Sequence, residues 1–140
     1  MAKMKTSLLK FVELLYGLLP MPVVEESTVD EVILTAGAPA LLVINVSNIA
    51  LVVYIFCIKW NGPNTPIRHD RELCSLSWQE LPNDLPQQAI IVQALIQAAI
   101  AIRRSKFHNC SYCKQPTPPE WQHNHNVCQG CAEKHLGVVH

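Results

Sequence analysis

The sequence predicts an α+β fold that ends in a small cysteine-containing module. Apolar residues recur at helical spacing near the N-terminus and again before residue 106, and runs rich in branched and aromatic residues lie between these two segments. Four of the six cysteines lie within the last 31 residues. A length of 140 residues suits one domain with an appended module. We therefore expect an α+β body over residues 1–106 and a separate module over residues 107–140.

The N-terminal segment 4–19 is expected to form a helix. Leu8, Val12, Leu15 and Leu19 recur on one face, and prolines at positions 20 and 22 end the pattern. Residues 23–31 follow with four carboxylates, which indicates an acidic connector. The helix is expected to pack on the body through its apolar face.

The segment Val32–Ile58 has 27 residues without a charge and allows two interpretations. A run of this length is typical of a single transmembrane helix. However, Pro39, Asn45 and Asn48 interrupt it, and its branched residues favour strands. We expect an antiparallel meander with strands over residues 31–35, 41–46 and 49–60 and with central strands covered on both faces. A single membrane span remains the alternative.

A fourth strand and a long helix should complete the body. Residues 72–78 alternate between apolar and polar side chains, as in a strand, and this one is expected at a sheet edge. A helix should begin near Asp84 and Pro86 and run to about Lys106. It is so apolar that we expect it to be largely buried, against the sheet or against a partner subunit. Arg103 and Arg104 would then interact with the negative end of the helix dipole.

The cysteine spacing predicts a metal site. Two CxxC pairs are separated by 14 residues, and their members are Cys110, Cys113, Cys128 and Cys131. Two pairs of thiolates at this spacing supply the four ligands of a tetrahedral zinc site. Four protein ligands leave no position for a catalytic water, so the predicted Zn²⁺ site is structural. A redox role would instead need one CxxC at the start of a long helix that follows a strand.

The tail resembles zinc-ribbon and treble-clef domains. The resemblance covers about 35 residues and is carried by two knuckle sequences, CSYCKQPT from Cys110 and CQGCAEKH from Cys128. It implies zinc binding, with the second pair at the start of a short helix in the treble-clef form. The ending NVCQGCAEK also looks like that of zinc-bearing HNH nucleases. His123 and His125 would then be candidate metal or catalytic residues, but the 14-residue excursion leaves little room for that motif, so we interpret them as polar loop residues.

Charge and composition narrow the expected function. Lysine plus arginine equals aspartate plus glutamate at 11 each, and this balance argues against a bulk electrostatic grip on nucleic acid. The sequence shows no phosphate-binding glycine loop and no hydrolase motif. We expect a non-enzymatic zinc protein that acts through protein–protein contact as an adaptor, an inhibitor or an assembly subunit, with Ala89–Ile102 as a surface for homo-oligomers. A nucleic-acid-binding or HNH-nuclease-like zinc protein is the first alternative.

The expected location follows from the cysteines. Four thiolates that hold zinc require a reducing compartment, and the N-terminus shows no clear secretion signal. We therefore expect a cytoplasmic protein. If Val32–Ile58 spanned a membrane, the acidic residues before it and the basic residues after it would place the zinc module in the cytoplasm.

Overall fold

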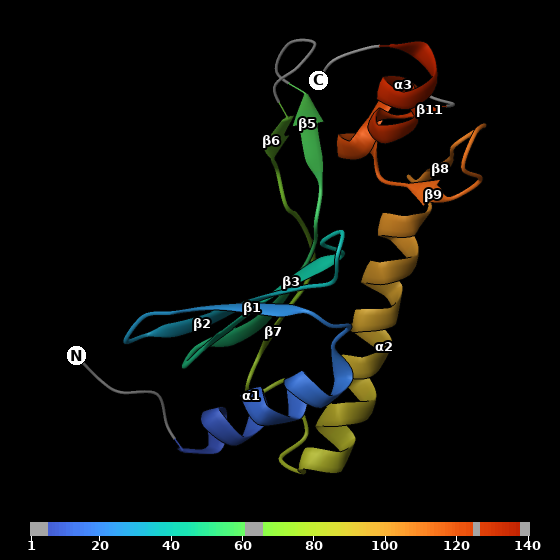
Figure 1. Ribbon diagram of the computed structural model, residues 1–140. Coiled ribbons are helices and arrows are strands. Elements are labelled where there is room, and N and C mark those ends of the chain that lie inside the picture. The colour runs from blue at the N-terminus through green and yellow to red at the C-terminus, as the bar shows by residue number, and fades with distance from the viewer. Residues whose placement is uncertain (1–5, 61–65, 125–126, 138–140) are drawn as a thin grey trace.

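A five-stranded antiparallel sheet with two helices on one face forms the body, and the expected α+β class is confirmed (Figure 1). The computed structural model describes residues 6–60, 66–124 and 127–137. The strand order is β1-β2-β3-β4-β7. The bounds of these strands are Val23–Ser27, Glu31–Ala36, Leu42–Ser47, Ala50–Ile55 and Arg71–Ser77. The helices that cover the sheet are α1, Thr6–Leu18, and α2, Leu85–Arg104.

The core lies between the sheet and the two helices. In-register neighbours such as Leu34, Ile44 and Val53 are fully buried on the helix side of three adjacent strands. They meet Phe11 from α1 and Ile96 from α2, both at most 2% exposed. Along β2 and β4, buried residues alternate with half-exposed ones. The expectation that central strands are covered on both faces was therefore wrong, and the uncharged run reflects a sheet with one partly open face.

The segment Val32–Ile58 forms strands, so the single-span alternative placed on it is wrong. It contains most of β2, all of β3 and β4, and the first residue of β5, Ile58–Trp60. Among the described helices, the one that is long and apolar enough to cross a membrane is α2. The internal asparagine Asn45 sits in β3 and donates a hydrogen bond to Glu31 Oε2 at 3.0 Å, which accommodates its polar side chain on the sheet.

Two other expectations for the body need correction. Residues 23–27 form the edge strand β1 instead of a connector, and its outer four residues are exposed, which is why its polar sequence did not look like a strand. The expected strand 49–60 divides in two. After β4 the chain leaves the sheet, and β5 pairs with β6, Pro66–Arg68, in a hairpin that projects toward the cysteine module (Figure 1). The strand β7 does lie at a sheet edge, as expected.

The long helix is buried along one narrow line. Val92, Ile96, Ala99 and Arg103 are its buried residues. By contrast, Ile90 is 70% exposed, and Gln93 and Gln97 are exposed. The expectation of a largely buried helix is therefore wrong for the single chain.

Trp78 fastens the end of the sheet to α1. Its Nε1 donates to the Ser47 carbonyl at 2.7 Å, and its ring meets Phe11 edge-on with 5.1 Å between centroids. We expect Trp78→Phe to lower the free energy of unfolding by about 1–2 kcal/mol, because the ring contact survives and the hydrogen bond does not. Urea unfolding measures this loss. Trp60→Phe, at a position 36% exposed, is the control and should change little, and equal effects of the two substitutions would contradict the assignment.

Candidate metal centre

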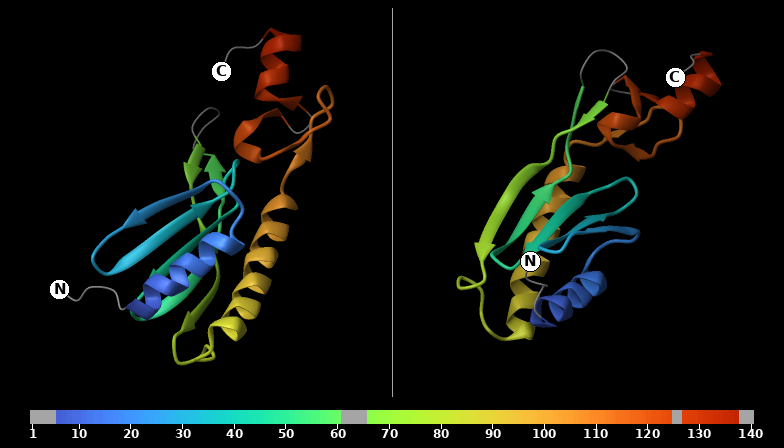
Figure 2. Two further views of the ribbon diagram at one scale, coloured as in Figure 1. Left: turned by 60° about the horizontal axis from the view of Figure 1, so that its bottom comes forward. Right: turned by 90° about the vertical axis from the view of Figure 1, so that its left-hand side faces the viewer.

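The cysteine module follows directly from the C-terminal end of α2. Two short hairpins build it, β8 with β9 and β10 with β11, together with a 3₁₀ turn and the helix α3. Their bounds are His108–Asn109, Pro116–Thr117, Gln122–Asn124 and Val127–Cys128 for the strands, Pro119–Trp121 for the turn η1 and Gln129–Leu136 for α3. All views place this module beyond the end of α2 (Figures 1 and 2).

The first cysteine pair lies in a tight turn after β8. The Lys114 amide donates to the Cys110 carbonyl at 2.9 Å, and the Cys110 amide donates to the Gln115 carbonyl at 3.0 Å. To close this turn, Lys114 adopts a left-handed backbone conformation with φ of 63°. The turn brings Cys113 back beside Cys110, as the CxxC spacing predicts.

The second pair lies at the start of α3. Cys128 is the residue before the first turn, and its Sγ accepts a hydrogen bond from the Cys131 amide at 3.4 Å. Gly137, with φ of 67°, ends the helix in the left-handed conformation that glycine adopts without strain. This placement at a helix start is the one expected from the treble-clef resemblance.

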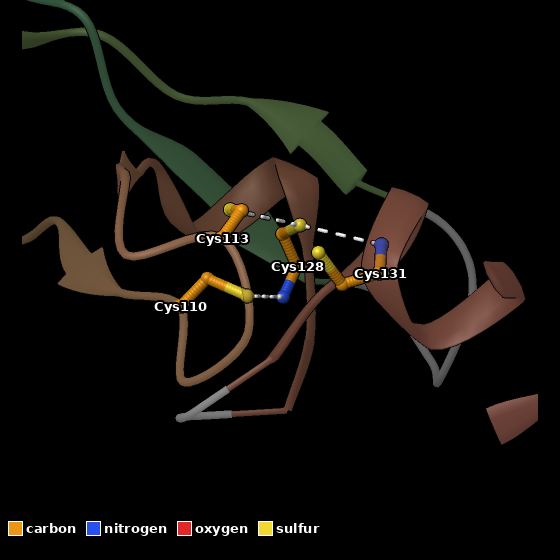
Figure 3. A group of neighbouring side chains, drawn as sticks. All are labelled: Cys110, Cys113, Cys128 and Cys131. Atoms are coloured by element: carbon orange, nitrogen blue, oxygen red, sulfur yellow. Dashed lines mark hydrogen bonds between the residues drawn. The ribbon is translucent and has the colours of Figure 1, made fainter. Parts of the chain in front are cut away.

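The four predicted ligands come together. Their Sγ atoms all lie within 4.8 Å of one another, and Cys113 Sγ is 3.9 Å from Cys128 Sγ (Figure 3). Zn–S bonds of about 2.3 Å in a tetrahedron require sulfur atoms about 3.8 Å apart, so the donor set fits a zinc ion. Among the described residues, this is the group of cysteine, histidine and carboxylate side chains close enough to hold a metal.

The protein polarises the four thiols unequally. The Cys128 amide donates to Cys110 Sγ at 3.4 Å, and this bond, followed by one from the Cys113 amide, lowers the pKa of Cys110 to about 6. For Cys131, hydrogen bonding with the Cys128 sulfur and burial raise the pKa to about 12, because further negative charge among neighbouring sulfurs is unfavourable. At pH 7 Cys110 is therefore mostly thiolate and Cys131 retains its proton.

Zinc binding should consequently depend on pH. The metal must displace the Cys131 proton, whose pKa of about 12 lies above the whole accessible range. We expect the apparent zinc affinity to rise at least about tenfold for each pH unit between 6.5 and 8, since one displaced proton gives that slope. Competition against a chromophoric chelator, corrected for the chelator's own protonation, measures it. An affinity that stays constant over this range would contradict the assignment.

Arg103 and Glu120 connect the module to the body. The Arg103 guanidinium is buried at 3% side-chain exposure and forms an ion pair with Glu120, which lies in η1 between the two cysteine pairs. Arg103 Nε also donates to the Ala40 carbonyl at 3.1 Å, in the connection between β2 and β3. The guanidinium further lies 5.2 Å from the Phe56 ring centroid and 5.0 Å from that of Phe107.

The sequence analysis missed this pair because it assigned Arg103 only to the helix dipole. A signal was available, since Arg103 continues the buried line of α2 at the spacing of Val92, Ile96 and Ala99. A charged residue on such a line needs a partner. The sequence did not identify Glu120 as that partner.

Aromatic residues of the module have different surroundings. Tyr112 stacks on His135 of α3 with 4.5 Å between ring centroids, which links the first knuckle to the helix of the second. Phe107 packs against the core of the body, as expected, whereas Trp121 is 51% exposed. His123 lies in β10, and His125 falls outside the described residues.

Fold and site together define an α+β protein with a C-terminal four-cysteine metal centre. When the chain is compared with known protein families, with curated proteins and with solved structures, none of them matches it. Its function must therefore be argued from its own residues.

Proposed function

We propose that this chain is a non-enzymatic zinc protein that acts through protein–protein contact. The observation that carries the proposal is the closed cluster of four cysteine sulfurs, all within 4.8 Å of one another. Four thiolates select a thiophilic ion, and a tetrahedral set of this kind is typical of structural Zn²⁺. All four positions would be filled by the protein, so the bound ion would support folding and would not activate water.

The surface supports contact with protein more than contact with nucleic acid. Balanced charge offers little attraction for phosphates. The solvent-facing side of α2, in contrast, has large uncharged areas that include Ile90 and Ile102. Apolar surface beside a metal-stabilised module is suited to an adaptor, an inhibitor or an assembly subunit. The preference of four-thiolate sites for reducing conditions supports a cytoplasmic location.

Elemental analysis of the purified protein tests the metal proposal. We expect about one zinc ion per chain and loss of the metal in Cys113→Ser, whose side chain is exposed and whose substitution leaves the core intact. Cys74→Ser, at a half-buried cysteine of β7, is the matched control and should retain zinc. Zinc-free native protein with four freely reactive module cysteines would overturn the proposal. A salt-sensitive shift of nucleic acid in a gel would favour the nucleic-acid alternative.

A further inference from the structure

The solvent-facing side of α2 carries no charge along most of its length. From Leu85 to Ile102 the helix has 18 residues without a lysine, arginine, aspartate or glutamate. Ile90 is 70% exposed and Ile102 is 36% exposed, on the side away from the buried Ile96. A helix face that remains in water normally carries charged residues. This face is therefore suited to a contact with another apolar surface.

The exposed residues follow the spacing of a helix–helix seam. Ile90, Ala94, Gln97 and Ala101 are separated by four, three and four residues, which is the 3.5-residue repeat of two packed helices. The three positions after Ile90 are exposed as well. The small alanines would let a second helix approach closely.

The same seam is complementary to itself in an antiparallel arrangement. A two-fold axis between Leu95 and Ile96 would place Ile90 of one copy opposite Ala101 of the other. It would likewise place Gln97 opposite Ala94. Large side chains would then meet small ones along the seam, as isologous contacts between identical surfaces require.

Charges at the two ends of α2 favour the same arrangement. The exposed Asp84 precedes the helix, and the exposed Arg104 and Lys106 lie at its end. An antiparallel partner would set the acidic start of one helix beside the basic end of the other, and the two helix dipoles would oppose each other. A parallel partner would instead set like charges side by side.

We propose that the partner of this surface is a second copy of the chain, bound through antiparallel pairing of α2. The inference rests on the proposed function in protein–protein contact and names the partner. In the views of the molecule, α2 runs along its margin, with α1 and the sheet on the other side (Figures 1 and 2). The pairing would place the two zinc modules at opposite ends of the dimer.

Sedimentation equilibrium of the zinc-loaded full chain tests the dimer. We expect a species of about twice 15.7 kDa, and in Ile90→Arg a rise of the dissociation constant by about 100-fold or more, because each dimer would bury two unpaired guanidinium groups. Ile49→Arg is the matched control, since Ile49 is 80% exposed in the connection between β3 and β4, and it should leave the dimer intact.

Disulfide trapping tests the orientation. In the antiparallel pair, Ile90→Cys should crosslink to Ala101→Cys when the two variants are mixed, whereas Ile90→Cys alone should not, because the two copies of position 90 would lie roughly 16 Å apart along the helix axis. The unsubstituted chain controls for the native cysteines. Efficient self-crosslinking of Ile90→Cys would overturn the antiparallel pairing.

A monomer that carries zinc would overturn the dimer and leave the zinc proposal standing. A monomer that floats with lipid vesicles would also overturn it and would assign the α2 surface to a membrane. A dimer that is lost in Ile90→Arg but contains no zinc would support the α2 contact and contradict the metal proposal. The two proposals can therefore fail separately.

Discussion

Chelation of zinc should unfold the module over residues 107–137 while the sheet remains folded. The module cannot hold itself together by apolar contacts, because the buried residues of its own cluster are Cys110, Val127 and Ala132. Metal binding in small modules of this kind contributes on the order of 10 kcal/mol to the folded state. Removal of the ion would leave four sulfurs within 4.8 Å of one another without a compensating charge.

Amide hydrogen exchange with and without a strong chelator measures this effect. Protection of the β8–β9 hairpin and of α3 should disappear on chelation and return when zinc is restored. Protection of β3 and β4, at the centre of the sheet, should persist. Cys110→Ser should reproduce the chelated pattern, and Cys74→Ser should not. Unchanged protection of α3 after complete zinc removal would show that the module folds without metal.

The same experiment tests the domain division at residue 106. If the body over residues 1–106 folds independently, its protected core should survive chelation. The buried Arg103 sets a limit to this independence, because its ion-pair partner Glu120 lies in the module. We therefore expect the body to remain folded but to lose stability when the module unfolds.

The cysteine site was the part most fully predictable from the sequence. Metal ligands must lie close together whatever the surrounding fold, so two CxxC pairs at a suitable spacing fix the geometry locally. Helix starts and stops were also accessible, since Pro20 and Pro22 follow α1 and Pro86 lies in the first turn of α2. These signals act over a few residues and do not depend on tertiary contacts.

Features that depend on tertiary context were missed. The polar Glu25 and Glu26 concealed β1, because an edge strand needs no apolar face when its neighbour supplies the hydrogen bonds. The division between β4 and β5 was missed because the apolar residues Phe56 and Cys57 continue across it. The apolar count of α2 could not distinguish burial in the body from burial against another molecule.

Glu120→Gln should destabilise the zinc-loaded protein by about 3–5 kcal/mol. The substitution keeps the shape of the side chain but leaves the Arg103 guanidinium without its counter-charge at 3% side-chain exposure. Removal of one partner of a buried ion pair leaves an uncompensated charge, which is more costly than loss of the pair as a whole. Glu72→Gln, at an exposed position of β7, is the control and should have little effect. Urea unfolding monitored in the body measures the difference.

The double variant Arg103→Met with Glu120→Gln separates the charge from the packing. It should recover most of the stability lost in Glu120→Gln, because no buried charge remains and the methionine retains contact with the rings of Phe56 and Phe107. Arg104→Met, at the exposed neighbour, controls for the loss of a cation at the end of α2. Additive destabilisation in the double variant would show that the pair does not act as a unit.

Chelation in this double variant connects the two predictions. In the native chain, unfolding of the module withdraws Glu120 and leaves Arg103 charged against the Ala40 carbonyl at the edge of the core. In the double variant that charge is absent, so zinc removal should lower the stability of the sheet much less than in the native chain. Equal losses in both would mean that the module supports the body through apolar contacts such as that of Phe107, and not through the buried ion pair.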